Sequence, residues 1–184
     1  VPNPPQESMD TLVRFAKVFD LAYKRFEDLK KAEYQARETQ IELALERVRS
    51  RSMAMQNSSE LKDVIQVVYQ QFIGLGIPIA HTGFIMDYKD REDMNIWLAD
   101  LNQFHSEITF PYFDSPHWNS FLEAKAKGEN FFSNLLDFDT KNTFYKDLFA
   151  LIPDLPKETQ DFYFAQEGLS ISTVLLENVG LYIE

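Results

Sequence analysis

The side chains of this sequence that could do chemistry gather in one short segment, residues 110–118, which reads FPYFDSPHW. The segment holds one carboxylate and one imidazole among several aromatic rings, a mixture typical of clefts that bind small molecules. Phe84, Trp97 and Phe132 could line the same side. The residues predicted to contact a ligand are therefore Phe84, Trp97, Phe110, Tyr112, Asp114, His117, Trp118 and Phe132. An ordinary core beneath a helix cap stays open as the alternative, because sixteen phenylalanines must be buried somewhere.

Signatures of enzymes are absent from the sequence. The three histidines, His81, His105 and His117, show no His-Glu-x-x-His spacing. Only six glycines are present, with no phosphate-binding loop and no nucleophile elbow. Asp137 and Asp139 are interpreted as caps of a helix that begins near residue 140, not as a catalytic pair. We expect no catalytic residues and no metal site in this chain.

Cofactors are restricted by the lack of cysteine. Thioether-linked bilins, thiolate metal sites and disulfides are excluded. Haem ligation through His105 or His117 is not expected, because a lone histidine near aromatic rings is usually a packed or surface residue. An unidentified small molecule is the only ligand class that we keep.

The net charge of −11 is unevenly distributed along the chain. Residues 9–55 hold ten Lys and Arg against eight Asp and Glu, whereas residues 56–184 hold eight against twenty. An acidic second half repels phosphate backbones and anionic lipids, so nucleic acid and membrane surfaces are not expected as partners. No run of about eighteen apolar residues could span a bilayer. These features, with the lack of cysteine, fit a cytoplasmic location.

A single long helix is predicted for residues 9–55, where apolar residues recur every three or four positions. The predicted packing positions, including those of the next helix, are Leu12, Phe15, Phe19, Phe26, Leu29, Ile41, Leu45, Val48, Leu61, Ile65 and Val68. One apolar stripe repeats every seven residues from Leu12, and a second repeats every seven residues from Ile41. The two stripes are offset from each other by one residue, and the change from one to the other falls in residues 33–40. Such a break changes the winding of packed helices and allows two packing registers to compete. Alternatively, each of the two apolar stripes packs against a different helical partner.

An α+β fold is predicted for the second half. A helix over residues 60–73 precedes strands at 81–88, 94–99 and 106–113. A helix follows at 118–127, with Ser115 and Pro116 at its start and Gly128 at its end. Then come a strand at 129–135, helices at 140–151 and 157–166, and strands at 169–176 and 178–184. The order lacks regular strand-helix alternation, so an antiparallel sheet with flanking helices is favoured.

Residues 40–55, QIELALERVRSRSMAM, followed by SEL at 59–61, resemble the connector that precedes GAF-type sensory domains in bacterial signalling proteins such as sensor histidine kinases, often from Bacteroidetes. RFAKVF at 14–19 and YKRFEDL at 23–29 are similar to the closing helix of a preceding GAF domain. The resemblance is specific over residues 9–61, whereas residues 62–184 match only in the order of elements. It implies a six-stranded GAF/PAS-like antiparallel sheet with a ligand pocket on one face. The chain lacks the Asn-Lys-Phe-Asp-Glu signature of GAF domains that bind cyclic nucleotides.

The resemblance also implies a domain division. Residues 1–8 form a Pro-rich linker, 9–56 the connector helix and 57–184 a GAF-like domain that stops before its own closing helix. The first part of the connector helix is expected to replace that closing helix, packing beside residues 60–73 in the same or a partner chain. The expected function is a non-enzymatic sensory module of a two-component system that forms a parallel homodimer and adjoins other domains of a longer protein. The alternative is a degenerate scaffold that dimerises and spaces its neighbours without binding a ligand.

Overall fold

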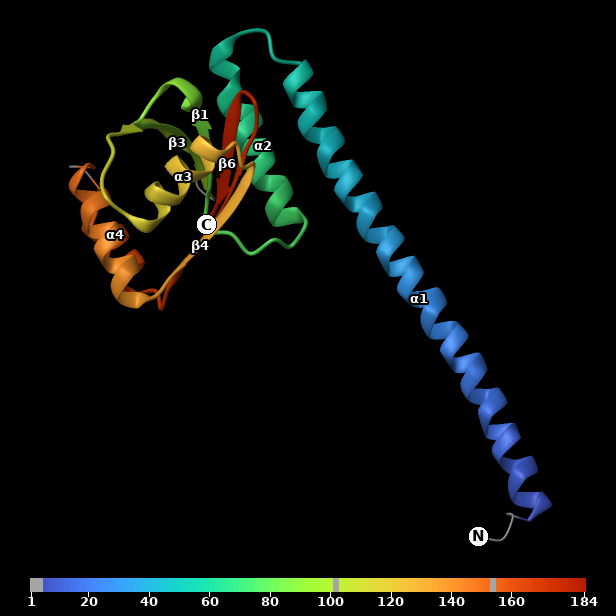
Figure 1. The fold of residues 1–184 in the computed structure, drawn as a ribbon. Coiled ribbons are helices and arrows are strands. Elements are labelled where there is room, and N and C mark those ends of the chain that lie inside the picture. The colour runs from blue at the N-terminus through green and yellow to red at the C-terminus, as the bar shows by residue number, and fades with distance from the viewer. Residues whose placement is uncertain (1–4, 101–102, 153–154) are drawn as a thin grey trace. The chain divides into compact units, whose positions relative to one another are not determined.

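The computed structural model describes residues 5–100, 103–152 and 155–184, and it describes no side chains for residues 100–106. The chain divides into two compact units, Val1–Arg47 and Val48–Glu184. Figure 1 shows the ribbon coloured along the chain. In the described part, no helix has both the length and the apolar character needed to cross a membrane.

The first unit is dominated by α1 (Gln6–Met53), which confirms the predicted long helix. The helix contains no glycine or proline, and Glu7 in its first turn and Arg51 in its last turn complement the helix dipole. It is continuous through residues 33–40, where the two apolar stripes change phase. The stripe of the first half is exposed: the exposed fraction is 71% for Leu12, 72% for Phe15 and 72% for Phe19. Packing of this stripe against another helix, in the same or a partner chain, stays a prediction.

The second unit is built on one open sheet of six antiparallel strands, in agreement with the predicted α+β class. The strand order is β3-β2-β1-β6-β5-β4. The strands are β1 (Thr82–Met86), β2 (Met94–Asp100), β3 (Gln103–Phe110), β4 (Phe131–Leu136), β5 (Leu169–Leu175) and β6 (Val179–Ile183). Strands that follow one another in the chain pair, except β3 and β4, which form the two edges of the sheet, and the first strand also pairs with the last.

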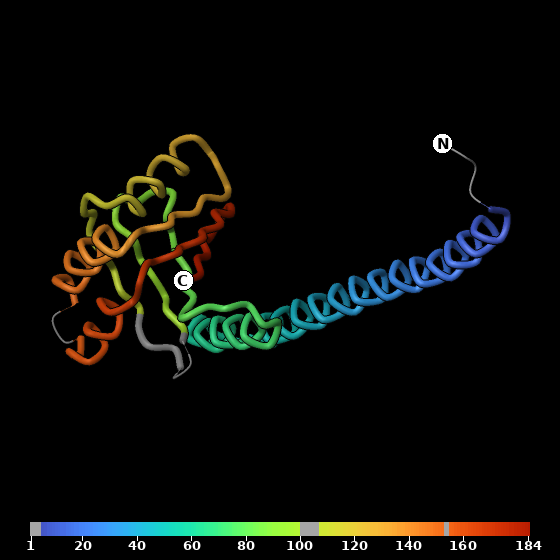
Figure 2. The backbone as a smooth tube through the Cα atoms, turned by 90° about the horizontal axis from the view of Figure 1, so that it is seen from below, coloured from blue at the N-terminus to red at the C-terminus, as the bar shows by residue number. Residues whose placement is uncertain are grey.

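Helices cover the two faces of the sheet unequally. On one face lies α2 (Leu61–Gly74), whose Ile65 and Tyr69 form a small core with Ala99. The other face carries α3 (Pro116–Lys127), α4 (Phe138–Ala150) and α5 (Lys157–Ala165) over the main core. Figures 1 and 2 show the strands between α2 on one side and α3 and α4 on the other. We call the α3–α5 side the inner face and the α2 side the outer face.

Local signals placed most helix ends correctly. Ser115 accepts a hydrogen bond from the Trp118 backbone nitrogen at 3.3 Å, and Gly128 ends α3 with a φ of 69°. Asp137 accepts from the Thr140 backbone nitrogen at 2.9 Å, so its predicted role as a cap is confirmed. Asn57 precedes the short 3₁₀ turn at Ser58–Glu60 without capping it, because its side chain makes no bond to the backbone of the helix start.

Two strands end earlier than predicted. The first strand stops at Met86, because Asp87 takes a left-handed conformation (φ 52°) and Tyr88 enters a short 3₁₀ turn, η2 (Tyr88–Asp90). The third strand stops at Phe110, before Pro111, which has no N–H to donate to a ladder. The segment after Phe110 is therefore a connection to α3, not a strand.

Candidate functional site

His117 lies over the centre of the inner face. Phe132, Thr173 and Tyr182 stand opposite one another on β4, β5 and β6. The His117 ring centroid is 5.6 Å from that of Phe132 and 6.4 Å from that of Tyr182. The first turn of α3, held by the Ser115 cap, places the imidazole there. The predicted ligand residue His117 is thus buried and directed at the sheet.

The hydrogen bonds of His117 define its tautomer. Asn134 on β4 donates through its side-chain nitrogen to Ser120 Oγ at 2.9 Å, so its oxygen is left to face His117 Nδ1 at 3.0 Å. His117 Nδ1 therefore carries the proton and donates it to that oxygen. Burial lowers the pKa of His117 to about 4, because the imidazolium would lose its hydration. The ring is neutral at pH 7.

A second polar group lies at the end of the same face. His81, just before β1, places Nε2 3.3 Å from Glu184 Oε2, just after β6. The Tyr145 hydroxyl of α4 donates to the other carboxylate oxygen of Glu184, and the Tyr163 hydroxyl of α5 lies 3.5 Å from His81 Nδ1. Burial, reinforced by the charge of Glu184, raises the pKa of Tyr145. The phenol therefore stays protonated and serves as a donor to the carboxylate.

Tyr182 connects the two polar groups. Its ring centroid is 5.7 Å from His81 and 6.4 Å from His117, and burial raises its pKa above the usual range. The ring lies against Gly83 on β1, where an added Cβ would lie 2.0 Å from Tyr182 Cε1. Glycine at position 83 is thus required for the tyrosine to occupy the centre of the face.

Two buried polar atoms on this face have no hydrogen-bonding partner within the described protein: Thr173 Oγ1 and Trp118 Nε1. Thr173 has no exposed surface, and Trp118 is 2% exposed. An unpaired buried donor costs about 1–3 kcal/mol, and such groups commonly mark the place of a bound water or ligand. Together with His117 and the Tyr145 group, they form the candidate site.

The structure divides the predicted ligand residues among three places. Phe110, His117, Trp118 and Phe132 come together in or against the inner core. Phe84 and Trp97 pair across β1 and β2 but lie on the outer face, packed with α2. Placing them on the same side as Phe132 was therefore wrong. Successive strand residues point to opposite faces, and Ile85 and Ile96 take the inner positions.

Tyr112 lies at the exposed edge of the inner core, with its ring 6.1 Å from that of Trp118, and Asp114 lies outside the core. The Tyr112 hydroxyl donates to Asn119 Oδ1 at 3.0 Å, and Asn119 Nδ2 donates to Asp114 at 2.8 Å. Asp114 borders an open depression of about 340 Å³ together with Asp139 and Asp147. Among the described residues, no three His, Asp or Glu side chains are grouped so as to hold a metal ion. The side chain of His105 lies outside the described part.

Sequence reasoning missed five members of the site: His81, Tyr145, Tyr163, Thr173 and Glu184. His81 and Glu184 meet because β1 pairs with β6, a non-local pairing for which the sequence carries no signal. The two tyrosines look like ordinary core aromatics in the sequence. Only their contacts with Glu184 and His81 distinguish them.

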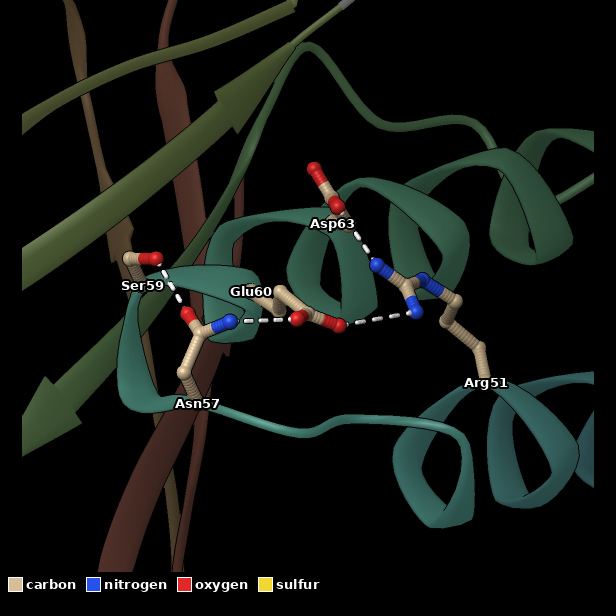
Figure 3. Close-up of polar contacts among 5 residues, drawn as sticks. All are labelled: Arg51, Asn57, Ser59, Glu60 and Asp63. Carbon is tan, nitrogen blue, oxygen red and sulfur yellow. Dashed lines mark hydrogen bonds and ion pairs between the residues drawn. The ribbon is translucent and has the colours of Figure 1, made fainter.

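The junction between α1 and α2, within the second unit, contains a second polar cluster. Arg51 in the last turn of α1 contacts Glu60 Oε2 at 3.4 Å and Asp63 Oδ2 at 2.5 Å. Asn57 Nδ2 donates to the other oxygen of Glu60 at 2.5 Å, and Ser59 donates to Asn57 (Figure 3). Arg51 is therefore only partly exposed and is held by two acidic side chains. We call Arg51, Asn57, Glu60 and Asp63 the junction cluster.

The predicted helix-packing residues also fall into different environments, from exposed to fully buried. Phe26, Leu29 and Leu45 are exposed, like the residues at the start of the stripe, and Ile41 and Val48 are half-buried. Ile65 is 1% exposed and belongs to the small core beneath α2, so it takes no part in any free helix surface. Leu61 packs against the same core, and Val68 is half-buried.

Comparisons with family models, with curated proteins and with solved structures give no match for this chain. The resemblance of residues 9–61 to the connectors of GAF proteins therefore stays a prediction. Function is inferred below from the contacts, burial and charge of the chain itself.

Proposed function

We propose that this chain is a non-enzymatic regulatory module of a signalling protein, in which a GAF-like unit biases the packing of a dimerising helix. The observation that carries the proposal is the exposed stripe of α1. Large apolar side chains at Leu12, Phe15, Phe19 and Phe26 are each more than half exposed on one uninterrupted helix. Most helical stability in proteins comes from packing an apolar face, so such a stripe calls for an apolar surface that covers it. A second copy of the chain can supply that surface.

The junction cluster supports coupling between the helix and the globular unit. Arg51 bridges the end of α1 to Glu60 and Asp63 at the start of α2, and α2 packs on the sheet. A shift of the sheet that moved α2 would act on Arg51 and so on the helix. A ligand could drive such a shift only by the difference in its affinity for the two packings.

The inner face supports a small polar molecule as the ligand. Thr173 and Trp118 offer unpaired buried donors, and neutral His117 and the Tyr145–Glu184 pair lie on the same face. No cofactor is needed for this role. Neighbouring domains of a longer cytoplasmic protein would receive the output.

A scaffold that only dimerises is the second candidate, and one observation favours it. Aromatic side chains fill much of the inner face: the rings of Phe113 and Trp118 lie 5.1 Å apart, and those of Phe113 and Phe144 lie 5.7 Å apart. A ligand would have to displace some of these rings.

The dimer is tested by size-exclusion chromatography with light scattering. We expect the unaltered chain to be dimeric and the double variant Phe15→Ser/Phe19→Ser to be monomeric, because the variant removes the apolar stripe. Lys17→Ser, on the same stretch of helix, is the matched control and should stay dimeric. A monomer of the unaltered chain at high concentration would contradict the proposal.

The sensor and the scaffold are separated by a thermal-shift screen against small metabolites. A compound that raises the melting temperature of the unaltered chain but not of Thr173→Val supports a ligand on the inner face. Thr173→Val keeps the shape of the side chain and removes only the hydroxyl. A flat response across the screen favours the scaffold.

A further inference from the structure

The outer face of the sheet carries a continuous apolar row that only one helix covers, and only at one end. Across β2, β1, β6, β5 and β4 the register aligns Trp97, Phe84, Leu181, Val174 and Phe131. α2 packs over Trp97 and Phe84. At the other end Phe131 is 59% exposed, and Leu135 on the same face of β4 is 85% exposed. We call Phe131, Leu135, Val174 and Leu181 the outer patch.

The position of the outer patch makes its exposure unusual. β4 is an edge strand, paired only with β5 in the described sheet. Proteins normally protect such edges with charges, prolines or a covering element, because exposed apolar edge strands aggregate. On β4, by contrast, Phe131 and Leu135 are apolar and exposed. This exposure marks the patch as a surface for a partner.

A helix is the covering element that this face accepts. α2 already lies on the same face, and its Ile65 and Tyr69 pack with Ala99. The apolar row runs on from beneath α2 to Phe131, so a second helix beside α2 would extend an existing helix-on-sheet layer. The outer patch therefore fits an amphipathic helix with a broad apolar stripe.

The first half of α1 has the required stripe, length and charge. Its aromatic residues at Phe15, Phe19 and Phe26 are bulky for a slim two-stranded coil and suit a broad sheet surface better. Residues 12–29 span roughly 27 Å at 1.5 Å per residue, more than the roughly 20 Å of a six-residue strand. Residues 12–29 carry four basic against three acidic side chains, whereas residues 56–184 carry twenty acidic against eight basic. The helix and the globular unit of another copy therefore attract each other.

We propose that the outer patch docks the first half of α1, residues 12–29, from a second copy of this chain. The exchange is reciprocal, so that each copy covers the other's patch and the assembly closes as a two-fold dimer. This proposal rests on the proposed dimer and adds which surface receives the aromatic half of the helix.

Disulfide trapping tests the docking directly, because the chain has no cysteine of its own. Leu135→Cys in one preparation is mixed with Phe15→Cys, Phe19→Cys or Phe26→Cys in another, and the mixture is oxidised mildly. At least one of the three helix positions should give a covalent dimer with Leu135→Cys. The matched control is Lys146→Cys, an exposed position on α4 at the inner side. It should give at least about tenfold less covalent dimer with the helix variants. Equal trapping at Lys146→Cys would overturn the proposal.

The double variant Phe19→Cys/Leu135→Cys distinguishes docking between two copies from docking within one chain. A disulfide between two chains supports the exchange, whereas a disulfide closed within one chain at low concentration overturns it. Helix-to-helix trapping of Phe19→Cys alone, with none to Leu135→Cys, also overturns docking on the sheet. That last result would leave the proposed dimer itself intact.

Light scattering of Leu135→Glu provides a second measurement. We expect dimerisation at least about tenfold weaker, equivalent to about 1.4 kcal/mol, while circular dichroism remains that of the unaltered chain because Leu135 is largely exposed. An unchanged dimer in Leu135→Glu would refute the docking but not the proposed function. A monomeric unaltered chain would refute both.

Discussion

Lys141 Nζ donates a hydrogen bond to the Tyr163 carbonyl oxygen at 2.8 Å, although Lys141 has no exposed surface. A second bond at 2.9 Å reaches the Phe164 carbonyl oxygen, and the ammonium lies 4.9 Å from the Phe138 ring centroid. Both carbonyls belong to the end of α5, where the helix dipole favours a cation. Lys141 therefore fastens the end of α5 to α4, and burial lowers its pKa.

Replacing Lys141 with methionine should lower the free energy of unfolding by about 3 kcal/mol, because two carbonyl oxygens lose a charged donor. Urea unfolding measures the change. Lys146→Met, exposed on the same helix, should alter the stability by less than about 0.5 kcal/mol. Equal effects of the two substitutions would show that Lys141 does not fasten α5.

Stability should fall as the pH is lowered from about 6.5 to about 4 because of His117. The pKa of His117 is about 4 in the folded chain, below its ordinary value of 6.5. Between these values the unfolded state binds more protons than the folded state, so acid favours unfolding, by up to about 3 kcal/mol. Chemical unfolding at a series of pH values measures the loss.

The matched variant for this prediction is His117→Gln, which keeps a donor toward Asn134 and cannot titrate. The difference in stability between the unaltered chain and His117→Gln should shrink as the pH approaches 4. A constant difference across that range would mean that His117 titrates in the folded chain as it does in the unfolded one.

Substitution of Arg51 by glutamine should loosen the junction between α1 and α2 with little loss of global stability. The ion pairs with Glu60 and Asp63 are partly exposed, and such pairs contribute little to global stability because water screens them. We expect faster amide hydrogen exchange at residues 54–60 and no change in the core strands. Lys62→Gln, exposed on α2, is the control and should leave exchange unchanged. If Arg51→Gln leaves amide exchange at residues 54–60 unchanged, the junction cluster does not couple α1 to α2.

Local sequence signals were enough to predict, in the correct order, every strand and α-helix that the structure describes in the second unit, but not its two short 3₁₀ helices. Ser115 with Pro116, Gly128 and Asp137 act on backbone groups within a few residues, so their effects can be read without the fold. The continuity of α1 likewise follows from a run of 48 residues with no glycine or proline. The error at the end of the first strand came from the left-handed turn at Asp87, which the sequence does not announce. The error at the end of the third strand came from extending it past Pro111, which is visible in the sequence.

Tertiary structure alone decided which distant residues meet. The pairing of β1 with β6 brings His81 to Glu184, and the face of each strand residue depends on what lies above it. The sequence alternates side chains along β1 but does not say whether Phe84 or Ile85 faces α3. By itself the sequence determined the elements, because helix caps and periodicity are short-range. Only packing assembled the inner face and left the outer patch open, since both depend on contacts between residues far apart in the chain.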